Sequence, residues 1–427
     1  MQVVVVGGGW AGCAAAWAAR AAGAKVALLE KTDLLLGTGL VGGIMYNNGR
    51  QTAACEIRAL GGGKFLDLID QVARHRNVNF PGHDHAMLYD VTRIEPVIRT
   101  ALYEAGVDIR LQIRVVDVNR EGNRIKSIVS AAGEIFNGDV FIDTTGTAGP
   151  QKNCTRYGTG CAMCILRCPS FGPRVSLVAR AGVEEIKAGE EFPHIEAMSG
   201  SCKLDKGSLD PSLVARLERE GFLVIPLPKE LYKDEMLGGK ACQQYAIEEY
   251  ARNMIILDTG HAKLMTSYFP LETLRSMPGF ARARFADPYS GGTGNSIRFM
   301  AMAPCGDDLS VSGVENLFCA GEKTGPLVGH TEAIATGMLA GHNAARRASG
   351  RQTLVLPADL AAGDIISYMH REMKNRAGLQ KKYTFSGSVY FDRMKYLGLY
   401  TTDRQAVEKR VAATGLQGVF NRIAGAS

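Results

Sequence analysis

The feature that most constrains the fold is a glycine-rich turn close to the N-terminus. A run of four valines leads directly into Gly7, Gly9 and Gly12, which are spaced as Gly-x-Gly-x-x-Gly. An alanine-rich segment of helical character follows, and a second apolar run ends at Glu30. This order of strand, glycine turn, helix, strand and acid predicts a dinucleotide-binding βαβ unit.

Each part of this unit has a physical role. Gly7 permits the tight turn, Gly9 lets the backbone approach a pyrophosphate, and Gly12 lets the helix pack close to the strand. The helix N-terminus offers free N–H groups to the phosphates. Glu30 follows Gly12 by eighteen residues, so it is placed to accept hydrogen bonds from ribose hydroxyls, and its charge disfavours the 2′-phosphate of NADP. The alternative is a tight strand-to-helix turn without a ligand.

The segment after this acid supplies further candidate cofactor contacts. Lys31 directly follows the ribose-binding acid, and Gly42 and Gly43 close a glycine-rich stretch. Glycine at this density lets the backbone lie against a flat ligand, whereas the alternative is a flexible loop. We therefore include Lys31, Gly42 and Gly43 among the predicted cofactor-binding residues.

The following segments predict two helices and then a series of strands. Apolar residues recur with helical spacing over 65–76 and 91–105, and residues 107–142 divide into short strands separated by turns. The last strand runs into Thr145 and Gly146. A buried strand that ends in Thr-Gly is where a doubly wound sheet returns to its ligand, so these two residues are further cofactor contacts.

A cysteine cluster is the second informative motif. It has the spacing C-x6-C-x2-C-x3-C and comprises Cys154, Cys161, Cys164 and Cys168. Four thiolates at such spacing can hold a soft metal centre, and the end of the run is similar to a ferredoxin-type motif. A 4Fe–4S cluster is the first interpretation. The alternatives are zinc, although the paired CxxC motifs of a zinc ribbon are absent, or redox and structural thiols.

Other polar residues of the middle segment favour structural roles. Cys202, Cys242 and Cys305 have no neighbour at metal-ligand spacing, so buried packing is the simpler interpretation for each. His261 is a candidate acid–base group, and a hydrogen-bonded loop histidine is the simpler alternative.

A later strand predicts a return to the dinucleotide sheet. An apolar run ends at Gly321 and Glu322, and a helix containing Thr336 and Gly337 follows. Glu322 can bind a ribityl hydroxyl, whereas the alternative is a capping or solvated acid. We expect the helix N-terminus near Thr336 and Gly337, where its dipole would stabilise negative charge on a reduced flavin.

Composition limits the class of protein. At 427 residues the chain is too long for one simple domain, and its net charge of +6 permits anionic partners without requiring them. No apolar run reaches the roughly 18 residues of a transmembrane helix, and a strand at residue 2 leaves no room for a signal peptide. We therefore expect a cytoplasmic location and cysteines that serve metal or redox chemistry rather than disulfides.

The C-terminal segment has two interpretations. Between Arg371 and Arg404, eight Lys and Arg residues are interleaved with Tyr and Phe. This pattern is typical of a nucleic-acid face, and it is equally typical of solvated helices with a tyrosine-lined core.

Three separated pieces, 7–30, 139–146 and 314–345, predict a discontinuous FAD domain, and the third resembles a known family. Residues 317–345 are similar to the C-terminal FAD signature of the GidA/TrmFO family. This resemblance implies a flavoprotein that modifies tRNA uridines, one branch of which methylates with methylenetetrahydrofolate. Residues 54–62 resemble the family stretch after the flavin loop, which implies that Cys55 is a functional cysteine.

The chain departs from the family pattern in three places. Glu322 stands where the family usually carries Gln, and the cysteine cluster is not part of that pattern. The middle domain does not place the family's second catalytic cysteine, for which Cys242 is the candidate.

The sequence therefore predicts an α/β fold with a Rossmann-like, glutathione-reductase-like FAD domain that is discontinuous. An inserted α+β domain and a helical C-terminal segment complete it. The expected segments are 1–150 and 286–350 for the FAD domain, 151–285 for the inserted cysteine-cluster and substrate domain, and 351–427 for the C-terminal segment.

Three functions are compatible with these features. The first is an FAD-dependent oxidoreductase that passes electrons between flavin, a 4Fe–4S cluster and a small-molecule substrate or electron carrier, with NAD(P)H as a candidate reductant. The second is a folate- and FAD-dependent RNA uridine methyltransferase, in which Cys55 and the basic C-terminus would matter most and RNA affinity would fall steeply with salt. Cys55 is a candidate nucleophile or redox thiol, and a packed small residue is the alternative. The third is a flavin-containing nucleic-acid-binding protein with structural zinc, for which a colourless metal centre and a flavin that NAD(P)H or dithionite does not reduce are expected.

Overall fold

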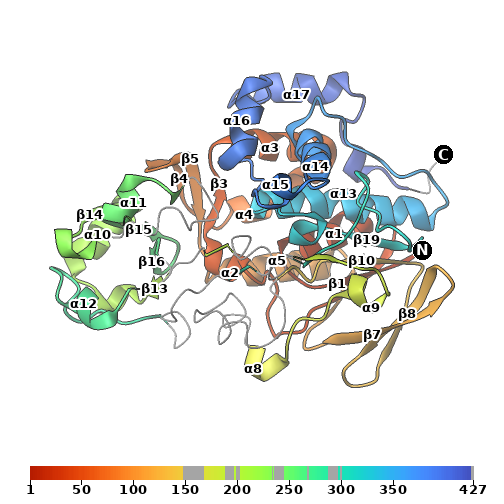
Figure 1. The fold of residues 1–427 in the computed structure, drawn as a ribbon, viewed down its shortest axis with the longest axis horizontal. Coiled ribbons are helices and arrows are strands. Elements are labelled where there is room, and N and C mark those ends of the chain that lie inside the picture. The colour runs from red at the N-terminus through yellow and green to blue at the C-terminus, as the bar shows by residue number, and fades with distance from the viewer. Residues whose placement is uncertain are drawn as a thin grey trace.

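A five-stranded parallel sheet organises the computed structural model, and three of its strands, β1 (Gln2–Val6), β10 (Val140–Asp143) and β19 (Leu317–Cys319), are labelled in the right half of Figure 1. The structure describes residues 1–147, 168–187, 197–198, 202–232, 234, 245–266, 269–286, 297–298 and 301–424. In spatial order the strands are β19, β10, β1, β2 (Lys25–Leu29) and β6 (Val107–Arg110). This sheet joins three distant pieces of the chain, which confirms the predicted α/β fold.

Both faces of the sheet are covered, which explains the unbroken valine run of β1. Val3 and Val5 pack into the core beneath the helices α1 (Trp10–Ala21) and α13 (His330–Ala348). Val4 and Val6 pack into a second core against an antiparallel sheet. That sheet consists of β7 (Val115–Glu121), β8 (Arg124–Ser130) and β9 (Ile135–Asn137). A strand buried on both faces has no position for a polar residue.

Helices α1 and α13 approach each other closely. A Cβ at Gly337 or at Gly341 would collide with a carbonyl oxygen of α1, those of Ala11 and Ala15 respectively. The expected helix start near Thr336 and Gly337 is wrong, because α13 already begins at His330. Gly337 thus lies inside the helix, where the missing side chain permits helix–helix contact.

The predicted helix over 65–76 is wrong in its second half. Helix α4 (Gly63–Asp70) ends early, and β4 (Ala73–Phe80) begins three residues later. The apolar residues that set the helical spacing all precede the strand, and the following residues are mostly Arg, His and Asn. Strand β4 pairs with β5 (His83–Tyr89), which pairs with β3 (Ile44–Tyr46), so sheet pairing decides its conformation.

The other predicted elements of the first half are present. The expected helix over 91–105 is α5 (Ile94–Glu104), and Cys55 lies on α3 (Gly49–Ile57). A π-helical turn, Arg58–Gly62, continues α3, and α2 (Gly39–Gly42) precedes β3. The expected strands over 107–142 are β6, β7, β8 and β10, to which the structure adds β9.

A separate antiparallel sheet lies in the middle of the chain. Its order is β13 (Cys202–Leu204), β16 (Ala262–Leu264), β15 (Asn253–Asp258) and β14 (Phe222–Pro226). Helices α10 (Pro211–Glu220), α11 (Glu248–Arg252) and α12 (Leu271–Arg275) accompany it, and it has its own apolar core. Figure 1 shows this unit at the left, beside β4 and β5. Its domain boundaries at 151 and 285 stay a prediction.

The remaining short elements connect these units. They are α8 (Cys168–Phe171), α9 (Leu177–Arg180), β11 (Ile186–Lys187), β12 (Ala197–Met198), β17 (Ile297–Arg298), β18 (Ala301–Met302) and the 3-10 turns Lys206–Ser208, Lys229–Leu231, Gly321–Thr324 and Val419–Asn421. Within the described ranges, every helix is too short or too polar to cross a membrane.

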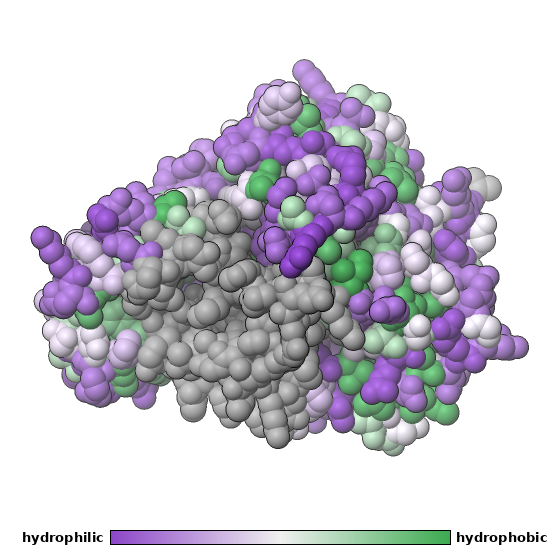
Figure 2. Space-filling model, in the orientation of Figure 1, coloured by the Kyte–Doolittle hydropathy of each residue, from purple (hydrophilic) through white to green (hydrophobic). Residues whose placement is uncertain are grey.

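The C-terminal segment is helical, as expected. It contains α14 (Ala361–Glu372), α15 (Arg376–Leu379), α16 (Ser388–Tyr396) and α17 (Arg404–Ala413), and the last two lie above α3 at the top of Figure 1. Tyr383, Phe385 and Tyr390 are fully buried, so the interpretation of a tyrosine-lined core is confirmed for these three. Hydrophilic side chains predominate over these helices on the face that Figure 2 shows. Within this C-terminal segment, the aromatic side chain of Tyr396 is exposed to solvent over 89% of its surface.

One buried carboxylate fixes the middle sheet to β4. The carboxylate of Asp258, at the end of β15, lies 2.9 Å from Arg74 Nε and 2.8 Å from His75 Nε2 on β4. It also lies 2.6 Å from Lys206 Nζ. Burial alone would raise the pKa of Asp258, but these three partners hold it well below its ordinary value. The side chain is therefore charged at neutral pH and joins the two units.

We predict that Asp258→Asn destabilises the protein by about 3 kcal/mol at pH 7, because it removes the buried carboxylate that pairs with Arg74 and Lys206. Urea unfolding measures this loss. The effect should be present above about pH 4, the ordinary pKa of an Asp. It should shrink as the pH falls further, because Asp258 then takes up a proton in the unfolded wild-type chain while it stays charged in the folded protein.

The matched control is Asp108→Asn, which removes an exposed pair with Arg110. We expect little change from this control. Equal destabilisation by the two substitutions would contradict the anchoring role of Asp258.

Candidate functional site

The glycine turn after β1 is shaped by two different requirements. At Gly7 φ is +104°, and a Cβ there would lie 2.6 Å from the carbonyl oxygen of Thr144. A Cβ at Gly12 would collide with the carbonyl oxygen of Gly7. The described chain itself therefore excludes side chains at both positions.

Gly9 is different, because nothing in the described structure lies within 4 Å of a Cβ placed there. Its φ of −67° and ψ of −177° are also open to any residue. The space in front of Gly9 therefore fits the close approach of a ligand rather than a packing requirement. Gly9 is the N-cap of α1 and no side chain caps it, so the first amides of α1 can bind a phosphate.

Glu30 is fixed beside this turn. Its Oε2 accepts a hydrogen bond from Gly8 N at 2.7 Å, and its Oε1 accepts one from Thr32 N at 2.8 Å. A carboxylate has about four acceptor positions, so Glu30 can accept further hydrogen bonds from ribose hydroxyls. Lys31 is directed elsewhere, since its Nζ lies 3.4 Å from the carbonyl oxygen of Gly172.

The ends of β10 and β19 meet beside the same turn, because these strands are neighbours in the sheet. Thr145 donates both N–H and O–H to Asp143 Oδ1, and Gly146 has a φ of +71°. Thr147 Oγ1 donates to Glu322 Oε2 at 2.9 Å.

Thr336 acts through the backbone of the neighbouring turn. Its hydroxyl accepts a hydrogen bond from Gly321 N at 2.9 Å, so it positions the turn after β19 from within α13. The structure thus brings the predicted residues 145–146, 321–322 and 336 together.

The predicted loop at Gly42 and Gly43 lies between two other elements. A Cβ at Gly42 would collide with the ring of His330, the first residue of α13, and a Cβ at Gly43 would collide with Thr259. At Gly43 φ is +82°, which favours glycine. Lys263 Nζ on β16 donates to the carbonyl oxygen of Gly42. The loop therefore separates α13 from the middle sheet.

Lys263 has an unusual environment that the sequence did not reveal. The register of β13 and β16 places Lys203 directly opposite Lys263, and both residues are buried. Burial and the neighbouring charge of Lys203 lower the pKa of Lys263 to about 7. A lysine with this pKa can give or accept a proton at neutral pH.

Two buried polar atoms near this loop have no hydrogen-bond partner among the described residues, His83 Nε2 and Thr259 Oγ1. The other ring nitrogen of His83 lies 2.6 Å from Asn47 Nδ2, which assigns the ring proton to Nε2. Burial, with Arg50 and Lys263 nearby, lowers the pKa of His83 to about 3, so the ring is neutral at pH 7. Unsatisfied buried groups indicate a position where a bound molecule supplies the missing hydrogen bonds.

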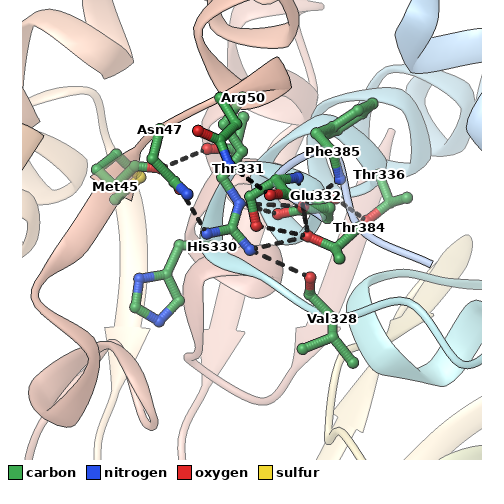
Figure 3. A network of polar contacts seen from close by, with 12 residues as sticks. Met45, Asn47, Arg50, Val328, His330, Thr331, Glu332, Thr336, Thr384 and Phe385 are labelled. Carbon is green, nitrogen blue, oxygen red and sulfur yellow. Dashed lines mark hydrogen bonds and ion pairs between the residues drawn. The ribbon is translucent and has the colours of Figure 1, made fainter. Parts of the chain in front are cut away.

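A buried ion pair fixes the start of α13 (Figure 3). Both carboxylate oxygens of Glu332 lie 3.0 Å from Arg50 Nε. One of them also accepts from Thr384 Oγ1 at 2.7 Å and from Phe385 N at 2.8 Å. Arg50 in turn donates to Asn47 Oδ1 at 3.0 Å. This network holds α3, α13 and the C-terminal segment in one arrangement around the loop.

Cys55 lies apart from these groups. It follows Arg50 by five residues on α3, so the two side chains leave different faces of the helix. Burial raises the pKa of the Cys55 thiol, although Arg58 and Arg404 oppose this effect. The structure therefore directs Cys55 toward α17, whose first residue is Arg404, and its catalytic role stays a prediction.

The predicted metal ligands cannot be placed together. Cys154, Cys161 and Cys164 lie outside the described residues, as does Cys242, and Cys168 begins α8. Among the described residues, there is no group of three or more His, Cys, Asp or Glu side chains that could hold a metal ion. His261 lies in the turn between β15 and β16.

The buried lysine gives a prediction for the pH dependence of stability. The pKa of Lys263 is about 7 in the folded protein, and an exposed lysine has a pKa of about 10.4. The unfolded chain therefore binds more protons between these values, so this residue makes stability rise with pH there. Lys263→Met should remove a slope on the order of 1 kcal/mol per pH unit from urea-unfolding free energies measured between about pH 7 and pH 9.

The matched control is Lys126→Met, because Lys126 is exposed on β8 and paired with Glu121. This substitution should leave the pH slope of the wild type unchanged. Parallel pH profiles for the wild type and Lys263→Met would show that Lys263 keeps an ordinary pKa.

Comparisons with known proteins agree with this geometry. The profile of the family described as "Glucose inhibited division protein A" matches residues 2–222 and 247–352. The chain is 25% identical over 404 residues to the methylenetetrahydrofolate–tRNA-(uracil-5-)-methyltransferase TrmFO of Symbiobacterium thermophilum, covering 86% of each protein. It is 25% identical over 405 residues to the tRNA uridine 5-carboxymethylaminomethyl modification enzyme MnmG of Alkaliphilus oremlandii, and the match covers 83% of this chain and 63% of that enzyme.

A solved structure supports the same relationship at the level of the fold. The form II crystal structure of Aquifex aeolicus GidA superposes with a TM-score of 0.65 at 20% identity, covering 97% of this chain and 72% of that one. The family profile extends over most of the chain, including the glycine turn, β10 and β19. The chain therefore belongs to the GidA family.

Proposed function

We propose that this protein is an FAD-dependent enzyme that modifies a uridine in tRNA. The observation that carries the proposal is the open space in front of the Gly9 backbone, which lies next to the fixed carboxylate of Glu30. The membership of the chain in the GidA family supports the same assignment. The names of the relatives describe enzymes of tRNA uridine modification. When bound, FAD would supply hydride or electron transfer, which side chains alone do not provide.

Different groups of the described residues would hold different parts of the cofactor. The amides at the start of α1 would hold the pyrophosphate, and Glu30 would hold the ribose. Gly321 and Glu322 would border the ribityl chain. The ring system would lie against the loop at Gly42–Gly43 and the start of α13, where the helix dipole favours negative charge.

The unsatisfied groups beyond this loop suit a uracil base. Uracil offers two carbonyl oxygens and one N–H group. The neutral ring of His83 can donate through Nε2, and Thr259 Oγ1 can donate or accept. Lys263, with a pKa of about 7, can transfer a proton beside them. These three residues form the proposed base-binding group.

A methyl transfer from methylenetetrahydrofolate is the specific reaction that we favour. The match to the TrmFO relative covers 86% of that protein, whereas the match to MnmG covers 63%. Cys55 is the nucleophile implied by the resemblance, although its thiol lies on the α17 side of α3. If Cys55 acts on the base, Cys55→Ala should abolish product formation while flavin is retained.

The proposal is tested with unmodified tRNA transcript, methylenetetrahydrofolate labelled at its one-carbon unit, and NAD(P)H. Label should appear in 5-methyluridine when the digested tRNA is analysed by mass spectrometry. Modified uridine without label would instead favour the MnmG type of reaction. An unaltered tRNA from a flavin-loaded protein would contradict tRNA modification.

Gly9→Ala gives a test of the flavin site alone. The added Cβ meets no described atom, so the flavin-free protein should lose only about 1 kcal/mol of stability or less. We expect the Kd for FAD, measured by absorbance titration of the flavin-free protein, to rise at least about tenfold, a loss of about 1.4 kcal/mol in binding. The control is Gly207→Ala, whose Cβ would make an ordinary 3.5 Å contact far from the turn. Full flavin content in Gly9→Ala would contradict the assigned cradle.

The cysteine motif supports one addition to this function. The spacing C-x6-C-x2-C-x3-C suits a 4Fe–4S cluster that would exchange single electrons with the flavin. Iron and acid-labile sulfide, assayed anaerobically, should then reach about four iron per FAD. Cys161→Ser should lose the iron and keep the flavin. An iron-free protein with bound zinc would favour a structural metal instead.

A further inference from the structure

A group of polar side chains outside the flavin site surrounds Cys305. Cys305 follows β18, and Asp307 lies two residues later in the same loop. Cys319 is the last residue of β19, and His370 lies in the last turn of α14. The group therefore connects three elements that are separate in the sequence, and none of its members serves the proposed flavin chemistry.

The geometry resembles that of an activated thiol. Cys305 Sγ lies 3.6 Å from His370 Nε2, and His370 Nδ1 lies 2.8 Å from Asp307 Oδ1. His370 Nε2 also lies 3.2 Å from the carbonyl oxygen of Thr324, which can only accept a hydrogen bond. The ring is thus held between a carboxylate on one side and a carbonyl and a thiol on the other. This arrangement of a cysteine, a base and an orienting acid is the one that activates a sulfur nucleophile.

The charges of the group support a thiolate next to an imidazolium. Burial opposes the charge of His370, but the hydrogen bond to Asp307 and the contact with Cys305 raise its pKa. The neighbouring thiol of Cys319 and the His370 ring lower the pKa of Cys305, against the effects of burial and of Asp308.

Two further cations face the acid of this group. The hydrogen bond to His370 is the main cause of the low pKa of Asp307. Arg371 and Lys374, which lie near this carboxyl, lower its pKa further. The acid therefore stays charged and keeps the ring of His370 oriented toward Cys305.

The two thiols differ in access. Cys305 is half-buried, the adjacent Gly306 is exposed, and 39% of the Asp307 side chain is exposed. Cys319 is completely buried, and burial raises its pKa well above the ordinary value. Cys305 can therefore meet a small reagent, whereas Cys319 can react only with a sulfur already placed at Cys305.

We propose that Cys305 and Cys319 form a thiol–disulfide exchange site for a small organic disulfide, with Cys305 as the attacking thiolate, Cys319 as the resolving thiol, and His370 and Asp307 as positioning residues. This site is independent of the proposed tRNA chemistry. The sequence alone favoured packing roles for isolated cysteines, and the proposal departs from that interpretation for Cys305.

The exchange takes place in two balanced steps. The Cys305 thiolate attacks a disulfide R–S–S–R, forms Cys305–S–S–R, and releases R–S⁻, which takes a proton from the solvent and leaves as R–SH. Cys319 then attacks Cys305 Sγ, forms the Cys305–Cys319 disulfide, and releases the second R–S⁻, which leaves as R–SH with the Cys319 proton. Two protein thiols are oxidised and one small disulfide is reduced. The new bond would tie the loop after β18 to β19, two residues before Gly321.

The first test uses the reduced full-length protein, oxidised glutathione as the probe, and peptide mass spectrometry. The wild type should form a Cys305–Cys319 linkage. Cys319→Ala should stop at the mixed disulfide and retain glutathione on Cys305, and Cys305→Ala should leave Cys319 unmodified. Absence of glutathione on Cys305 in folded Cys319→Ala would overturn the proposal, as would absence of the linkage in the wild type.

The second test distinguishes positioning from a merely structural role of His370. The rate of alkylation of Cys305 by iodoacetamide is followed against pH, with Cys55 in the same sample as the reference thiol. Cys305 should react with a midpoint well below that of Cys55, and His370→Gln should reduce its rate near pH 6.5 at least about tenfold. Equal midpoints for Cys305 and Cys55 in the wild type would overturn the assigned thiolate.

Discussion

The close approach of backbone to backbone around α1 is the constraint on which the rest of the structure depends. Gly12 lets α1 begin against the turn of Gly7, and Gly337 and Gly341 let α13 lie against the carbonyl groups of the same helix. Any side chain at these positions would push α1 away from the glycine turn or α13 away from α1. Because α13 carries His330 and Glu332 at its start, this contact also positions the far side of the proposed flavin site.

Electrostatics decides how the middle sheet meets this core. Asp258 binds cations of β4 and thereby brings the turn at Thr259 and the strand of Lys263 against the loop at Gly42. Among the described residues, no carboxylate forms an ion pair with Lys263, which lies opposite a second lysine. Its burial therefore costs stability in the folded chain. A protein tolerates such a cost at functional positions, and the unsatisfied atoms of His83 and Thr259 lie at the same junction.

The sequence predicted the parts of the site whose signal is local. The turn of Gly7, Gly9 and Gly12 and the acid at Glu30 lie within one βαβ unit, so spacing alone made them candidates. The helix start near Thr336 was misplaced because a glycine that permits helix packing has the same appearance in a sequence as one that ends a turn. His83, Lys263 and the Arg50–Glu332 pair were missed, because their environments arise only when distant segments meet.

Cys305 shows that sequence spacing also fails to reveal a residue's chemical partners when they come from distant segments. Its partner His370 is 65 residues away in the chain, so no spacing pattern links the two. The residue that would resolve the exchange, Cys319, ends the strand that leads into the flavin turn at Gly321. A disulfide there would restrain the backbone whose N–H is held by Thr336. The redox state of the thiols would then act on the flavin site through that shared strand, without any contact between sulfur and flavin.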